Sequence, residues 1–112
     1  MFQATGQTTD KVFAALADPA RRHLLTTLAE GSPRTVTQLT AGFPKKITRQ
    51  GVTKHLELLA AAGLVRARAA GREKHYTLAP EPLDEVAAWL QVIGARWDAR
   101  LAKLKALVEA EE

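Results

Sequence analysis

The chain of 112 residues contains no cysteine. Disulfide scaffolds, zinc ribbons, iron–sulfur clusters and thiol catalysis are therefore excluded for this chain. The sequence also lacks a paired nucleophile and base, a glycine-rich phosphate loop, and clustered carboxylates beside an acid. Because these arrangements carry most enzymatic chemistry, we expect the protein not to be an enzyme.

Long apolar runs are missing as well. Residues 1–10 have no basic stretch that leads into an apolar one, and no run approaches the ~18 residues of a membrane span. We therefore expect a soluble cytoplasmic protein without a membrane partner. With 46% hydrophobic and 25% charged residues, the composition is typical of a globular protein, and the length predicts a single domain over residues 1–112.

Positive charge is concentrated in the middle of the chain. Residues 41–80 hold eight Lys or Arg and two Asp or Glu, whereas residues 1–40 hold four and three, and residues 81–112 hold four and seven. A basic middle third favours a surface that binds a polyanion, since phosphate neutralisation supplies much of the affinity for DNA. The alternative is a charge cluster that only solvates the surface.

The first part of the chain predicts two helices separated by a proline. The first helix begins near Thr8 or Thr9, whose hydroxyl can cap it, and ends before Pro19. Asp18 is then predicted to be the N-cap of a second helix, with proline at the first helical position, where its missing N–H has no partner to lose. This helix is expected to run from about residue 19 to residue 30.

Two more helices follow. Thr35 and Gln38 have the spacing of a capping box, in which each side chain accepts from the other residue's backbone, so a short helix begins there and ends at Gly42. The fourth helix runs from Thr48, again a capping residue, to Ala62.

The pattern then changes to short strands. Residues 64–68 and 74–78 flank a turn at Ala70-Gly71-Arg72, which is typical of a β-hairpin. After Pro82 a long final helix is predicted at about 83–110. The expected fold is therefore mainly α with a small β-hairpin, in the order α-α-α-α-β-β-α.

The fourth helix is amphipathic. Its apolar face consists of Val52, Leu56, Leu59 and Ala60. Its opposite face carries residue types that hydrogen-bond base edges or phosphates, namely Arg49, Gln50, Thr53 and Lys54. Thr48 and His55 complete the DNA-binding site predicted on this helix. His55 lies on the flank of the apolar face, so a packed or hydrogen-bonded histidine is the alternative there. An ordinary solvated helix face is the alternative interpretation of the same stripe.

Other basic residues are predicted to contact the DNA backbone. They are Arg22 in the second helix, Lys45 and Lys46 in the turn before Thr48, and Arg66, Arg68, Arg72 and Lys74 in the hairpin. Arg72 lies beside the glycine of the turn, where it could enter a minor groove or hold a phosphate. The alternative for the hairpin is an edge that charge keeps soluble.

Four segments together resemble the ArsR/SmtB family of bacterial repressors. They are Ala14 to Arg22, Val52 to Leu56, Ala62 to Val65 and Gly71 to Leu78. The resemblance implies a homodimeric winged helix-turn-helix repressor. It assigns residues 35–62 to the helix-turn-helix, with residues 48–62 as the recognition helix, and residues 64–78 to the wing.

The sequence departs from this family at two places. The stretch from Leu39 to Val52 is about two residues longer than usual, which affects the register of the recognition helix. Many members sense metals, but residues 35–39 read Thr-Val-Thr-Gln-Leu where the family's cysteine motif would fall, and no His follows Leu83. His23, His55 and His75 also lack metal-ligand spacing, so we expect no metal site and no cofactor.

Apolar residues recur along the final helix at intervals of three or four, close to a heptad seam. With Phe13 of the first helix, they are the predicted dimer interface: Leu83, Val86, Leu90, Ile93, Trp97, Leu101 and Leu104. The chain has few other elements that could cover so long a seam. We therefore expect a twofold homodimer through the terminal helices.

These observations favour a sequence-specific transcriptional regulator of double-stranded DNA. A homodimer would place two recognition helices in successive major grooves and would repress by occluding its operator. The alternative is a winged-helix module that binds proteins without specific DNA binding. The basic middle third argues for DNA.

Overall fold

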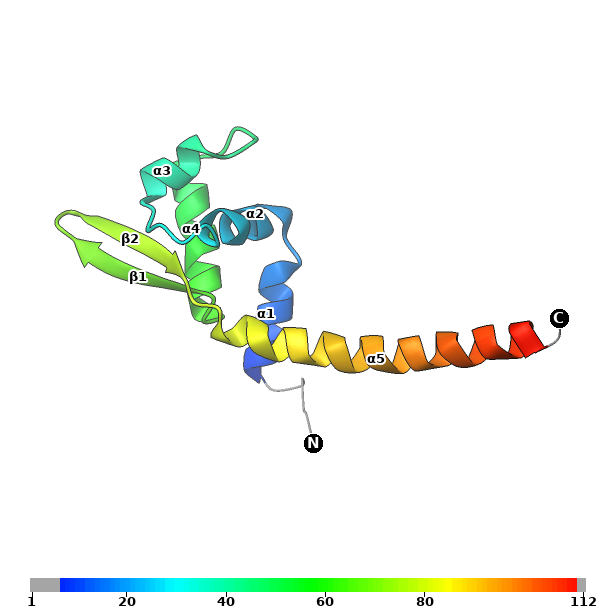
Figure 1. Ribbon diagram of the computed structural model, residues 1–112. Helices are drawn as coiled ribbons and strands as arrows, with labels where there is room; N and C mark the ends of the chain where they lie inside the picture. The colour runs from blue at the N-terminus through cyan, green and yellow to red at the C-terminus, as the bar shows by residue number, and fades with distance from the viewer. Residues whose placement is uncertain (1–6, 111–112) are drawn as a thin grey trace.

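The computed structural model describes residues 7–110, so residues 1–6 and 111–112 of the predicted domain lie outside the described residues. The elements follow the predicted order (Figure 1): α1 (Gln7–Leu16), α2 (Pro19–Leu28), α3 (Val36–Ala41), α4 (Arg49–Ala61), β1 (Val65–Ala70), β2 (Glu73–Leu78) and α5 (Glu81–Ala110). Within the described range, none of the helices has both the length and the hydropathy needed to cross a bilayer.

Local capping chemistry sets the starts of the three middle helices, as predicted. Asp18 caps α2, with its Oδ1 accepting from the backbone N–H of Ala20 at 2.8 Å. At α3 both bonds of the capping box are formed: Gln38 N–H donates to Thr35 Oγ1 at 3.2 Å, and Thr35 N–H donates to Gln38 Oε1 at 2.9 Å. Thr48 caps α4 by accepting from Gly51 N–H at 2.9 Å.

Three predictions about helix ends were wrong. Thr9 is not a cap but lies inside α1, buried, and its hydroxyl donates to Glu85 Oε2 of α5 at 3.1 Å. The second helix ends at Leu28 rather than near residue 30. The final helix starts at Glu81 rather than residue 83, because Pro82 fits the first turn of a helix, where no backbone donor is needed.

A single hydrophobic core joins α1, α2, α3, α4, the hairpin and the start of α5. Its fully buried large side chains are Leu24, Leu28, Leu56, Leu59, Leu64, Val12 and Val52. The apolar face predicted for α4 is therefore confirmed except at Ala60, which is exposed at the edge of the stripe. This core holds α4 against the body and leaves its polar face to solvent.

The hairpin is anchored to the helix-turn-helix by backbone pairing. β1 and β2 are antiparallel with Val65 opposite Leu78, and Gly71 occupies the tight turn with a φ of 65°. Tyr76 of β2 also exchanges two backbone hydrogen bonds with Arg34, which lies just before α3, at 3.1 and 2.8 Å. The wing therefore has a defined position beside α3 and α4.

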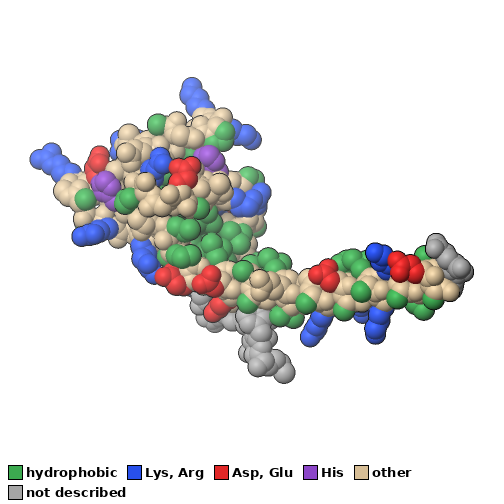
Figure 2. Space-filling view, in the orientation of Figure 1, with side chains coloured by type: hydrophobic (Ala, Val, Ile, Leu, Met, Phe, Trp, Pro, Cys, Tyr) green, Lys and Arg blue, Asp and Glu red, His purple; other side chains and the backbone are tan. Residues whose placement is uncertain are grey.

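Helix α5 leaves the body after its first turns and extends far beyond it, so the molecule measures 69 × 32 × 21 Å (Figure 1). Val86 is buried in the chain's own core, and Leu83 packs against that core. From Leu90 onward the apolar side chains of the helix are exposed. Figure 2 shows hydrophobic side chains continuing along the projecting helix.

Candidate nucleic-acid interface

The predicted reading face of α4 forms one continuous surface. Arg49, Gln50, Thr53, Lys54 and Glu57 line a shallow hollow together with Val36 of α3. Because the N-cap and the buried face fix the helix at its start and along its length, these side chains are presented from a rigid element. Four of the five can donate hydrogen bonds to base edges or phosphates, and Glu57 lies one turn beyond Thr53, where a carboxylate repels phosphate.

A second hollow connects this face to the wing. Its lining combines Arg49 and Thr53 of α4 with Arg72 and Lys74 of the hairpin. Thr37 of α3 borders the same hollow, although we did not predict it. The sequence feature that could have indicated Thr37 is its position: it is a polar residue in the first turn of the capping-box helix, directly after the apolar Val36.

The two remaining arginines of the hairpin lie on its other face. The strand register pairs Arg66 with Thr77 and Arg68 with His75, so both lie on the face opposite to that of the buried Tyr76 and its partner Ala67. Arg66 Nη2 donates to Glu81 Oε1 at 2.7 Å. The pKa of Glu81 lies below its ordinary value, first because its own backbone N–H donates to the carboxylate and then because Arg66 does.

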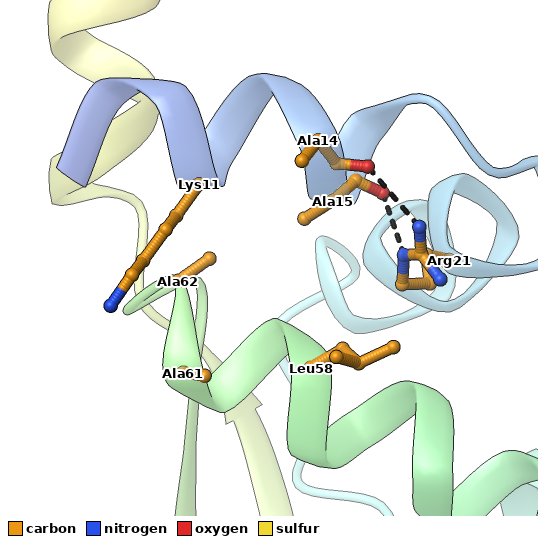
Figure 3. A pocket seen from close by; sticks show the side chains of 7 residues that line it. All are labelled: Lys11, Ala14, Ala15, Arg21, Leu58, Ala61 and Ala62. Atoms are coloured by element: carbon orange, nitrogen blue, oxygen red, sulfur yellow. Dashed lines mark hydrogen bonds between the residues drawn. The ribbon is translucent and has the colours of Figure 1, made fainter. Parts of the chain in front are cut away.

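The arginines at the start of α2 serve the fold. Arg22 Nη1 donates to the carbonyl of Leu16 at 2.7 Å, although its side chain stays exposed. Arg21 donates to the carbonyls of Ala15 at 2.9 Å and Ala14 at 3.1 Å (Figure 3). Since the last carbonyls of a helix lack intrahelical partners, these two side chains cap the C-terminus of α1.

Arg21 also reaches α4. Its Nη1 lies 3.5 Å from His55 Nδ1 and 3.8 Å from Asp18 Oδ2. His55 is half-buried and does not line either hollow of the reading face. Because a guanidinium can only donate, the contact orients the imidazole from the domain side.

Asp18 is the acidic centre of this contact. Burial raises the pKa of Asp18. Hydrogen bonds from the backbone of Arg21 and Ala20, together with the charge of Arg21, lower it by more than burial raises it, so the pKa lies below its ordinary value. The carboxylate thus stays charged while it caps α2.

Lys45 and Lys46 lie in the turn between α3 and α4. Both are exposed, and they border a cavity against the start of α2 instead of the hollows that Arg49 and Thr53 line. Figure 2 shows basic side chains extending from the hairpin and from this turn, whereas acidic ones gather where α5 leaves the body. No group of three His, Cys, Asp or Glu within residues 7–110 is arranged to hold a metal ion.

The predicted dimer residues divide into two sets. Val86 packs inside the chain and so cannot be part of an exposed surface, while Phe13 is 36% exposed and meets Trp89 edge to face with ring centroids 5.4 Å apart. The exposed set is Leu90, Ile93, Trp97, Leu101 and Leu104. These residues form one stripe on the part of α5 that projects from the body.

The chain is similar in sequence to known helix-turn-helix proteins. A family model described as a helix-turn-helix domain matches residues 16–68. The HTH-type transcriptional regulator Rv2034 of Mycobacterium tuberculosis is 33% identical over 108 residues, which cover 96% of this chain and 95% of that protein.

Solved structures agree. An ArsR-like transcriptional regulator from Rhodococcus sp. RHA1 is 38% identical, with a TM-score of 0.74 and 94% of each chain covered. A homodimeric winged helix-turn-helix DNA-binding domain from Mycobacterium bovis is 28% identical, with a TM-score of 0.62 and 79% of each chain covered. The chain therefore belongs to the ArsR family of winged helix-turn-helix transcriptional regulators.

Proposed function

We propose that this regulator binds a specific operator as a homodimer and represses transcription by occluding it. The observation that carries the proposal is the continuous surface on which Arg49 and Thr53 of α4 meet Arg72 and Lys74 of the wing. A recognition helix and a basic hairpin on one surface can engage a major groove and the adjoining backbone together.

The side chains of α4 divide by chemistry. Arg49 can make bidentate bonds to guanine and Gln50 to adenine, while Thr53 can bond a base or contact a thymine methyl. Lys54 contacts guanine or phosphate. Arg72 and Lys74 hold backbone phosphate beside the groove that α4 enters. Arg66 has a lesser role, since its guanidinium is already paired with Glu81.

The proposed dimer uses the exposed stripe of α5. Trp97 is 57% exposed and Leu104 59%, although both are large apolar side chains. A long exposed apolar stripe is typical of a surface that another copy or partner covers. The M. bovis relative is described as homodimeric. A twofold axis would set two recognition helices about 34–36 Å apart, one turn of DNA.

The proposal needs no metal and no catalytic group. The residues that would replace the family's cysteine motif, Thr35 to Leu39, include the α3 capping box and a buried leucine, so they serve the fold. We infer a repressor that is not a metal sensor and that acts on DNA in the cytoplasm.

Fluorescence anisotropy with labelled duplexes tests the proposal. Random duplex should bind at low salt and lose affinity steeply as salt rises, with a log–log slope of about −0.9 for each neutralised phosphate. Fragments selected from genomic DNA should bind at least ~10³-fold more tightly than random duplex at physiological salt. Absence of binding even at low salt would contradict the proposal and favour a protein-binding module.

A further inference from the structure

The turn between α3 and α4 forms a cavity with the start of α2. Its volume is about 340 Å³, and its walls include Pro19 and His23 of the α2 segment and Phe43, Lys45, Lys46 and Ile47 of the turn. Pockets for small ligands begin at about 300 Å³ and are mostly apolar with a few polar groups. The cavity lies outside the reading face of α4.

Two aromatic rings form the inner wall of the cavity. The rings of His23 and Phe43 lie with centroids 4.8 Å apart and planes inclined by 59°. Phe43 and Ile47 are partly buried and pack against the hydrophobic core, so the core supports this wall of the cavity. Aromatic rings in this arrangement favour a planar aromatic ligand, which can stack on one ring and meet the other edge to face.

The mouth of the cavity is positive. Lys45 and Lys46 are both exposed there. Asp18 also borders the cavity, but its carboxylate accepts hydrogen bonds from the backbone of Ala20 and Arg21 and lies 3.8 Å from the Arg21 guanidinium. Its charge is thus compensated on the domain side, and the two ammonium groups favour an anionic ligand.

We propose that this cavity binds a small aromatic carboxylate, whose ring lies against His23 and Phe43 and whose carboxylate pairs with Lys45 and Lys46. The bound ligand weakens DNA binding by acting on the start of α4. This second part rests on the proposed function, whereas binding in the cavity does not.

The connection to α4 is short. Ile47 lies against the first turn of the helix, where a β-carbon placed on Gly51 would be only 3.3 Å from Ile47 Cγ1. Thr48, the next residue, is the N-cap, and Arg49 and Gln50 follow at once. A ligand that prefers a shifted Ile47 therefore favours a different position of the reading residues. The carboxylate also neutralises two lysines predicted to contact phosphate.

Titration of the ¹⁵N-labelled chain of 112 residues with 2-naphthoate tests the binding step, with the uncharged 2-naphthalenemethanol as the matched probe. Saturable amide shifts are expected at Phe43, Ile47 and Gly51, with naphthoate bound about tenfold more tightly than the alcohol. Shifts confined to α5, or equal affinity for both probes, would overturn the assignment.

Charge variants supply the control. Lys45→Gln with Lys46→Gln should lower naphthoate affinity about tenfold. Lys103→Gln with Lys105→Gln removes the same charge from the exposed end of α5 and should leave the affinity unchanged. An equal loss in both pairs would show that only net charge matters and would contradict a site at the turn.

DNA anisotropy with and without saturating naphthoate tests the regulatory step. The ligand should weaken DNA binding of the unmodified protein several-fold. Ala20 also lines the cavity, so Ala20→Phe should fill it and remove the effect of the ligand. Unchanged DNA affinity in the presence of ligand would overturn this step. A protein that shows the amide shifts but binds no DNA would contradict the proposed function and leave the cavity assignment standing.

Discussion

Arg66 of β1 and Glu81 of α5 form an ion pair across the base of the wing, with 2.7 Å between Nη2 and Oε1. Both side chains are largely exposed, so the pair adds little to stability. The ion pair matters for the orientation of the Arg66 side chain, because it holds the guanidinium on the α5 side of the hairpin. Arg72 and Lys74 are left to line the hollow beside α4.

The first prediction concerns this division of the wing. Arg72→Ala should weaken binding to all duplexes alike and reduce the salt slope by about one unit, since one phosphate contact is lost. Arg66→Ala, a matched removal of one charge, should have a clearly smaller effect on both quantities. Anisotropy over a salt series measures both, and equal effects would place Arg66 at the DNA.

A second prediction concerns sequence readout. Gln50→Ala should reduce discrimination between operator and mismatched duplex by about 1–3 kcal/mol at one base pair, because a bidentate contact to adenine is lost. Binding to random duplex should change little. Competition assays with single-base operator variants measure this, and unchanged discrimination would show that a different residue of α4 reads this base pair.

A third prediction concerns the cap of α2. Asp18→Ala should lower the free energy of unfolding by about 1 kcal/mol, since the N-cap bonds are lost. Asp18→Asn keeps a capping oxygen but removes the titrating charge.

The pH dependence follows from the lowered pKa of Asp18. In the folded chain this pKa lies below its ordinary value of 3.8, so the stabilisation is complete above that pH and is lost as pH falls through the folded value. Urea unfolding between pH 6 and pH 3 should therefore show a smaller loss of stability for Asp18→Asn than for the unmodified protein. Identical pH profiles would contradict the role of the charge.

A fourth prediction concerns the proposed dimer. Ile93 and Val92 are neighbours on α5 with exposed fractions of 43% and 41%, but only Ile93 belongs to the apolar stripe. Ile93→Glu should dissociate the dimer, and Val92→Glu should not, because a helix turns about 100° between the two positions. Analytical ultracentrifugation measures the outcome, and dissociation by both variants alike would contradict the assigned face.

Local signals in the sequence were enough to predict most of the fold. Asp18-Pro19, the Thr35 and Gln38 box and Thr48 each carry their own hydrogen-bonding partners within three residues, so their helices begin where expected. The reading face of α4 could be predicted for the same reason, because a helix brings residues three and four apart together.

Features that depend on distant partners could not be predicted. Thr9 meets Glu85 across 76 residues, although it was predicted to be a cap. Val86 has the spacing of the α5 stripe, but spacing alone does not separate a side chain that seals the chain's own core from one that awaits a partner.

The stripe on α5 has a consequence for how the protein behaves as its amount changes. The same stripe first packs on the core at Leu83 and Val86 and then continues into solvent. In the proposed dimer, pairing of the free part holds the packed part in place, so folding and association are linked by mass action. The melting temperature should therefore rise with protein concentration, and operator occupancy should respond to cellular abundance more steeply than a single-chain binder would.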